Sequence, residues 1–103
     1  MAFKGNPEDV LPDIIKAIKQ KVDSKSTREF RIGRTSDLSR RMSEYNFDEI
    51  IDLYYTESDD RAKFVEGILI DNFEYDPKCA NKRRDGGSFS KEYGNYVYLG
   101  IWY

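Results

Sequence analysis

The sequence of 103 residues contains no histidine and a single cysteine, Cys79. Without histidine the chain has neither a Ser-His-Asp triad nor a Cys-His pair, so these routes to nucleophilic catalysis are excluded. A structural zinc site needs several cysteine or histidine ligands and is all but excluded too. One cysteine also rules out a disulfide within the chain.

Long hydrophobic runs are missing as well. No apolar stretch approaches the roughly 20 residues that span a bilayer, and the N-terminus, MAFKGNPEDV, has no apolar core of a signal peptide. We therefore expect a cytoplasmic, intracellular protein that does not contact a membrane. The net charge is −2, which excludes a wholly basic surface for nucleic acid but allows a local basic face.

The length and the apolar pattern predict one domain, residues 1–103, with alternating helices and strands. Three segments have apolar residues at helical spacing and follow a residue that can cap a helix. They are residues 7–22 after Asn6, residues 37–45 after Ser36 or with Asp37 as the cap, and residues 59–73 after Ser58. The segments REFRIG, EIIDLYYTE and NYVYLGIWY are typical of strands.

These elements predict an α+β fold with a small, mainly antiparallel three-stranded sheet flanked by helices. Phe30 and Ile32 should point to the same side of the first strand. The strand EIIDLYYTE is almost continuously apolar, so we expect it at the centre of the sheet.

Arginines concentrate in the stretch FRIGRTSDLSRR, residues 30–41, although the chain is acidic. Gly33 lets the chain turn tightly from strand to helix, which should bring Arg34 and Arg41 toward one face. A structural alternative for Arg41 is that its aliphatic part covers the edge of the apolar face while its charge stays in water.

Glu66 falls within the apolar stripe of the third helix. A buried carboxylate costs free energy unless it is paired or binds a cation. The alternative is a residue at the rim of the stripe, salt-bridged to a lysine.

Three further features allow both a functional and a structural interpretation. The loop residues Lys82, Arg83 and Arg84 can reach phosphates or simply be solvated. Asn81 can fix a turn or contact a ligand. Tyr98 can fill the core, as most such rings do, or act as a general base.

Taken in order, FRIGRTSDLSRRMSEY, FVEGILI and NKRRDGG resemble the GIY-YIG endonuclease superfamily, in particular its short phage and bacterial branch. The second motif of that family ends in Ile-Gly, here Ile32-Gly33, and the family's arginine follows eight residues later, at Arg41. The metal-binding glutamate corresponds to Glu66. The asparagine and Gly-Gly pair correspond to Asn81 and Gly86-Gly87.

The sequence departs from this family in two places. Phe30 replaces the tyrosine of the second motif, and no strand ending in Gly-Ile-Tyr precedes it. The terminal GNYVYLG is similar to the missing first motif. We therefore expect this strand to pair antiparallel with EFRIG in a circularly permuted arrangement, with Tyr98 in the place of the family's first tyrosine. The alternative is that the first motif is lost.

The resemblance implies metal-dependent hydrolysis of nucleic acid with little sequence specificity, and DNA is favoured over RNA. Glu66 would hold Mg²⁺ or Mn²⁺, Arg41 the scissile phosphate and Tyr98 the proton of the attacking water, while Asn81 would order the site. Flanking phosphates would be contacted by Arg31, Arg34, Arg40, Lys82, Arg83 and Arg84.

Two other interpretations stay open. A catalytically degenerate domain could bind nucleic acid or a protein without cutting. The aromatic C-terminus could instead be an exposed edge strand that pairs with a partner or with a second copy, giving a homodimer through the C-terminal strand.

Overall fold

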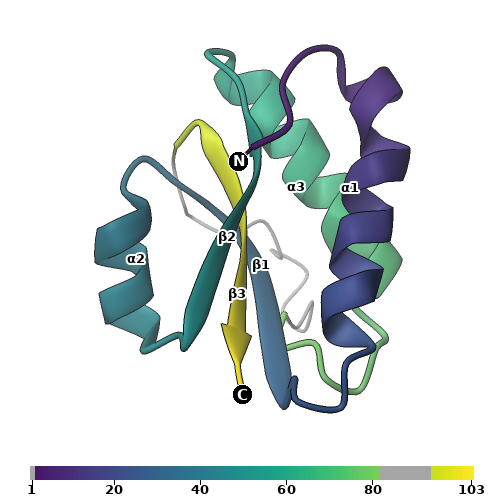
Figure 1. Ribbon diagram of the computed structural model, residues 1–103. Coiled ribbons are helices and arrows are strands. Elements are labelled where there is room, and N and C mark those ends of the chain that lie inside the picture. Colours follow the sequence, from purple (N-terminus) through teal and green to yellow (C-terminus); the bar gives the residue numbers. More distant parts are fainter. Residues whose placement is uncertain (1, 82–93) are drawn as a thin grey trace.

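A three-stranded sheet divides the helices into two layers (Figure 1). The computed structural model describes residues 2–81 and 94–103. Its elements are α1 (Pro7–Val22), β1 (Glu29–Thr35), α2 (Leu38–Tyr45), β2 (Glu49–Tyr55), α3 (Asp59–Phe73) and β3 (Tyr96–Trp102). Helices α1 and α3 cover one face of the sheet and α2 lies against the other. The predicted α+β fold with an antiparallel three-stranded sheet is confirmed.

Short polar side chains start each helix where the sequence predicts. The backbone N–H of Glu8 donates to Asn6 Oδ1 at 3.3 Å, and Asp37 Oδ1 accepts from Arg40 at 3.0 Å. Ser58 Oγ accepts from the N–H of Arg61 at 3.2 Å. Each cap satisfies a backbone donor that the helix itself cannot.

The main core lies between the sheet and the pair α1 and α3. Phe30 and Ile32 both point into it and are fully buried, as the alternation along β1 predicts. Helix α1 contributes Ile14 and Ile18, and α3 contributes Leu69, among others. In the described part of the chain, every helix is too short or too polar to cross a bilayer.

The strand order is β1-β3-β2, so the C-terminal strand is central and β2 is an edge strand. The prediction that EIIDLYYTE is central is therefore wrong. Its apolar side chains pack on the core, where Leu53 and Tyr54 are buried and Ile51 is partly buried. The N-terminal segment also covers part of its outer edge: Phe3 N–H donates to Leu53 O at 2.9 Å, and Tyr55 N–H donates to Phe3 O at 3.0 Å.

Both sides of β3 are paired, which overturns the interpretation of the C-terminus as an exposed edge strand. Dimerisation by strand addition to β3 has no free edge to use. The predicted antiparallel pairing of this strand with EFRIG is confirmed, with Gly33 opposite Tyr98 and Phe30 opposite Ile101.

Gly100 provides a test of how closely the segment after α2 packs on the sheet. A Cβ atom at Gly100 would lie 2.2 Å from Cζ of Phe47, so the ring must move to admit a methyl group. We expect Gly100→Ala to lower the free energy of unfolding by about 1–3 kcal/mol, measured by urea denaturation.

The matched control for this prediction is Gly67→Ala, because a Cβ atom at Gly67 meets nothing within 4 Å. This helical position should gain up to about 1 kcal/mol from the better propensity of alanine. Equal stability of Gly100→Ala and the wild type would contradict the packing of Phe47 over Gly100.

Candidate functional site

Two arginines share one aromatic ring on the α2 side of the sheet. The guanidinium of Arg31, from β1, lies 4.8 Å from the ring centroid of Tyr45, and that of Arg41, from α2, lies 5.7 Å from it. The Tyr45 ring in turn stacks on Phe47 at 5.2 Å between centroids. Cation–π attraction to the ring helps to hold two like charges near each other. We call Arg31, Arg41 and Tyr45 the arginine–tyrosine stack.

Arg41 is held in place, whereas its neighbour Arg40 projects into solvent. The Arg41 side chain is 15% exposed and its Nη1 lies 3.5 Å from Glu44 Oε1. Arg40 is largely exposed and reaches the same carboxylate only at 4.0 Å. The two neighbouring arginines therefore differ in exposure, and the roles that the sequence predicts for them stay predictions.

Tyr98 lies on the same face of the sheet as this stack. It is fully buried, and its ring meets Phe47 edge-on at 5.8 Å between centroids. The structure thus brings Tyr98 and Arg41, two of the predicted catalytic residues, to the α2 face.

Glu66 lies on the other side of the sheet, in α3. It is 3% exposed, and its Oε1 accepts a hydrogen bond from Arg34 Nε at 3.0 Å. Arg34 is 5% exposed and its Nη1 also lies 3.1 Å from Asp59 Oδ1. Successive strand residues point to opposite faces, so Arg34 turns toward α3 while Gly33 lies on the face of Tyr98.

This ion pair corrects one interpretation of Glu66. The residue is buried within the fold and not at the rim of the helix, and the cation that it contacts in the described residues is Arg34. Removing two opposite charges from water together is far less costly than burying either one alone. Arg34, predicted to contact phosphates, is directed into the protein instead.

Among residues 2–81 and 94–103, the surroundings of Glu66 do not fit a divalent ion in this arrangement. Magnesium keeps several waters and binds one or two carboxylates, but the Glu66 carboxylate is buried and one of its oxygens is bound to a guanidinium. The described residues also contain no group of three acidic, histidine or cysteine side chains that could hold a metal ion.

Asn81 closes the outer edge of β1. Its side-chain oxygen accepts from the N–H of Ile32, and its Nδ2 donates to the carbonyl of Ile32, both at 2.8 Å. The amide thereby makes the two hydrogen bonds that a further strand would make. It continues the covering of this edge by Lys78 and Ala80, which pair with Phe30.

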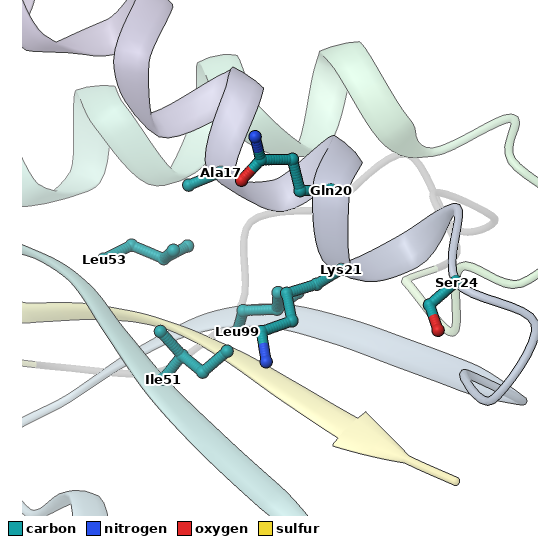
Figure 2. Close-up of a pocket in the computed structure, with 7 residues that line it drawn as sticks. All are labelled: Ala17, Gln20, Lys21, Ser24, Ile51, Leu53 and Leu99. Atoms are coloured by element: carbon teal, nitrogen blue, oxygen red, sulfur yellow. The ribbon is translucent and has the colours of Figure 1, made fainter.

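A separate pocket lies between the last turns of α1 and the sheet (Figure 2). It has a volume of about 400 Å³ and is lined by Ala17, Gln20, Lys21, Ser24, Ile51, Leu53 and Leu99. None of these lining residues is a predicted site residue, and the pocket is on the side of the sheet away from α2. The pocket is therefore distinct from the arginine–tyrosine stack.

Sequence reasoning missed Tyr45 and the burial of Arg34. Tyr45 follows Arg41 by four residues, a spacing that places both side chains on one side of a helix and could have indicated their contact. The alternation of Phe30 and Ile32, continued by two residues beyond the predicted strand, places Arg34 on the buried face and could have indicated its burial. The predicted residues Lys82, Arg83 and Arg84, and the pair Gly86-Gly87, lie outside the described residues.

The Arg34–Glu66 pair gives a stability prediction. Arg34→Met or Glu66→Leu alone leaves one charge buried and should cost about 3–5 kcal/mol of unfolding free energy, whereas the double variant should recover most of that loss. Urea denaturation of the four proteins measures the coupling.

Asp59→Ala is the control, because Asp59 is exposed and its bond to Arg34 should contribute about 1 kcal/mol or less. Single-variant losses that simply add in the double variant would show that Arg34 and Glu66 do not act as a pair.

Comparison with known protein families identifies a T5orf172 domain over residues 14–95. The matched segment begins within α1 and ends just before β3. This family is GIY-YIG-like and associated with phage endonucleases. The corresponding comparisons with curated proteins and with solved structures found no match.

Proposed function

The chain belongs to the T5orf172 domain family, whose match indicates a nuclease-like or nucleic-acid-binding module, and we propose that it binds nucleic acid through the α2 face of its sheet. The observation that carries this proposal is the arginine–tyrosine stack. It gathers two guanidinium groups on one face of a protein whose net charge is negative.

The chemistry of the stack suits phosphate. A guanidinium that contacts an aromatic ring through its flat face keeps its N–H groups in the plane of the group, where they can donate to phosphate oxygens. Because the ring restrains both side chains before binding, less rotamer entropy is lost when a phosphate is bound.

The remaining basic residues divide into two groups. Arg40 is exposed next to the stack and is a further candidate for a phosphate contact. The sequence alone makes Lys82, Arg83 and Arg84 candidates as well. Arg34 is withdrawn by Glu66 and Asp59 and is left out of the proposed interface. Contacts of this kind follow the backbone without reading bases, so we propose little sequence specificity. We favour DNA over RNA on the resemblance to endonucleases, because phosphate contacts alone do not distinguish the two.

Metal-dependent phosphodiester hydrolysis is the second candidate function. It is favoured by the location of Arg41 and Tyr98 on one face and by the antiparallel pairing of β3 with β1, which a circular permutation requires. The engagement of Glu66 by Arg34 disfavours it, because the resemblance assigns Mg²⁺ or Mn²⁺ to that carboxylate. We therefore rank binding first.

The binding proposal predicts a graded loss of affinity when the stack loses charge. Arg31→Gln and Arg41→Gln should each weaken binding to a labelled DNA duplex several-fold. Each should also reduce the slope of log K against log salt by about 1, because each removes one phosphate contact. Fluorescence anisotropy over a range of salt concentrations measures both quantities, and an RNA duplex of the same sequence tests the preference for DNA.

Arg28→Gln serves as the matched control, since Arg28 is exposed outside the stack and the substitution removes the same charge. An equal loss with Arg28→Gln would assign the effect to net charge instead of to the stack. Absence of salt-dependent binding in the wild type would overturn the proposal.

A plasmid assay separates the two candidate functions. If the protein binds DNA without cutting it, supercoiled plasmid should stay intact in the presence of Mg²⁺ or Mn²⁺. Nicking by the wild type that is abolished by Arg41→Gln and by Tyr98→Phe, in variants that still bind DNA, would establish hydrolysis in place of binding alone.

A further inference from the structure

Glu44 lies against two of the arginines of the proposed interface. Its Oε1 is 3.5 Å from Arg41 Nη1, and its Oε2 is 4.0 Å from Arg40 Nε. Residues three and four positions apart lie on the same side of a helix, so this spacing in α2 allows both contacts at once. Each oxygen of one carboxylate therefore faces a different guanidinium beside the arginine–tyrosine stack.

The stability of α2 does not account for an acid at this position. Glu44 is in the last turn of the helix, where the partly negative carbonyl end favours a cation and disfavours a carboxylate. The Glu44 side chain is 49% exposed, and exposed ion pairs of this spacing stabilise a helix only weakly. Glu44 therefore has more influence on the charge of the two arginines than on the helix that carries them.

A phosphate bound at these arginines would meet the carboxylate at close range. A phosphate oxygen that accepts a hydrogen bond from Arg41 Nη1 lies next to the atom that Glu44 already faces. In water, repulsion between two like unit charges about 5 Å apart weakens binding about fourfold, and protein around the charges strengthens the effect. The carboxylate must therefore swing away when a phosphate binds, and its half-exposed position leaves room for that movement.

We propose that Glu44 is a competing counter-ion: it engages Arg40 and Arg41 in the free protein and thereby lowers the affinity of the α2 face for nucleic acid. This inference rests on the proposed binding of nucleic acid through that face. It assigns to Glu44 an effect opposite in sign to that of the arginines. Loss of this one side chain should strengthen binding, whereas loss of either Arg41 or Arg31 should weaken it.

The experiment compares Glu44→Gln with the wild type by fluorescence anisotropy on a labelled DNA duplex. Glu44→Gln should bind at least about threefold more tightly, because the repulsion of phosphate and the competition for the arginines are both removed. Glu8→Gln is the matched control. Glu8 is exposed in the first turn of α1, on the other side of the sheet, and the substitution removes the same charge (Figure 1). It should tighten binding clearly less.

A second comparison tests whether Glu44 acts through the arginines. In a background that carries both Arg40→Gln and Arg41→Gln, the gain from Glu44→Gln should shrink, because the cations that the carboxylate engages are gone. Low salt keeps the weakened binding measurable. An undiminished gain would overturn the assignment of Glu44 as a counter-ion of these arginines.

The outcomes separate this inference from the proposed function. If neither the wild type nor Glu44→Gln binds DNA, the proposed function is overturned and this inference with it. If the wild type binds and Glu44→Gln binds no more tightly than Glu8→Gln, only the role of Glu44 is overturned. Urea denaturation of each variant confirms that these exposed substitutions leave the fold intact.

Discussion

The buried contact between Arg34 and Glu66 joins the sheet to α3 and withdraws one arginine of the basic stretch from solvent. It ties the end of β1 to the middle of the helix, and Asp59 extends it to the first turn of α3. Both charges are withdrawn from water. If either side chain moved away, the charge of the other would stay buried without its partner. Arg34 and Glu66 thereby hold α3 against the sheet, whereas Arg31 and Arg41 lie on the α2 side.

Arginines from one stretch of sequence have different surroundings on the two sides of the sheet. Arg31 and Arg41 are cations held at a surface by an aromatic ring, whereas Arg34, in the same stretch of sequence, is a buried counter-ion. The difference comes from the alternation of a strand, which sends neighbouring side chains to opposite faces. The basic cluster of the sequence thus divides between the two faces of the sheet, with Arg34 in a buried ion pair on one face and Arg31 and Arg41 on the other.

Much of the fold follows from local rules. Capping side chains such as Asn6 and Ser58 and the apolar periodicity determine the helices, and the alternation of Phe30 and Ile32 gives the buried face of β1. Strand order did not follow, because it depends on pairing between distant segments, and an apolar strand such as β2 can be covered at its edge by Phe3. For the site, the sequence predicted Arg41, Tyr98 and Glu66 as functional residues but not their distribution over two faces. That distribution depends on the path of α3 across the sheet, which no local pattern encodes.

The central location of β3 also has a consequence for the order of events in biosynthesis. Strands β1 and β2 do not pair with each other, so neither has a neighbour in the sheet until residues 96–102 have left the ribosome. Until then the sheet against which α1 and α3 pack lacks its central strand. The edges of β1 and β2 that later pair with β3 stay open to other chains. The closing contacts join residues far apart in the sequence, so the entropy of closing long loops must be overcome before they form. The sheet of the nascent domain is therefore completed late, and the domain is most prone to aggregation just before residues 96–102 pair with β1 and β2.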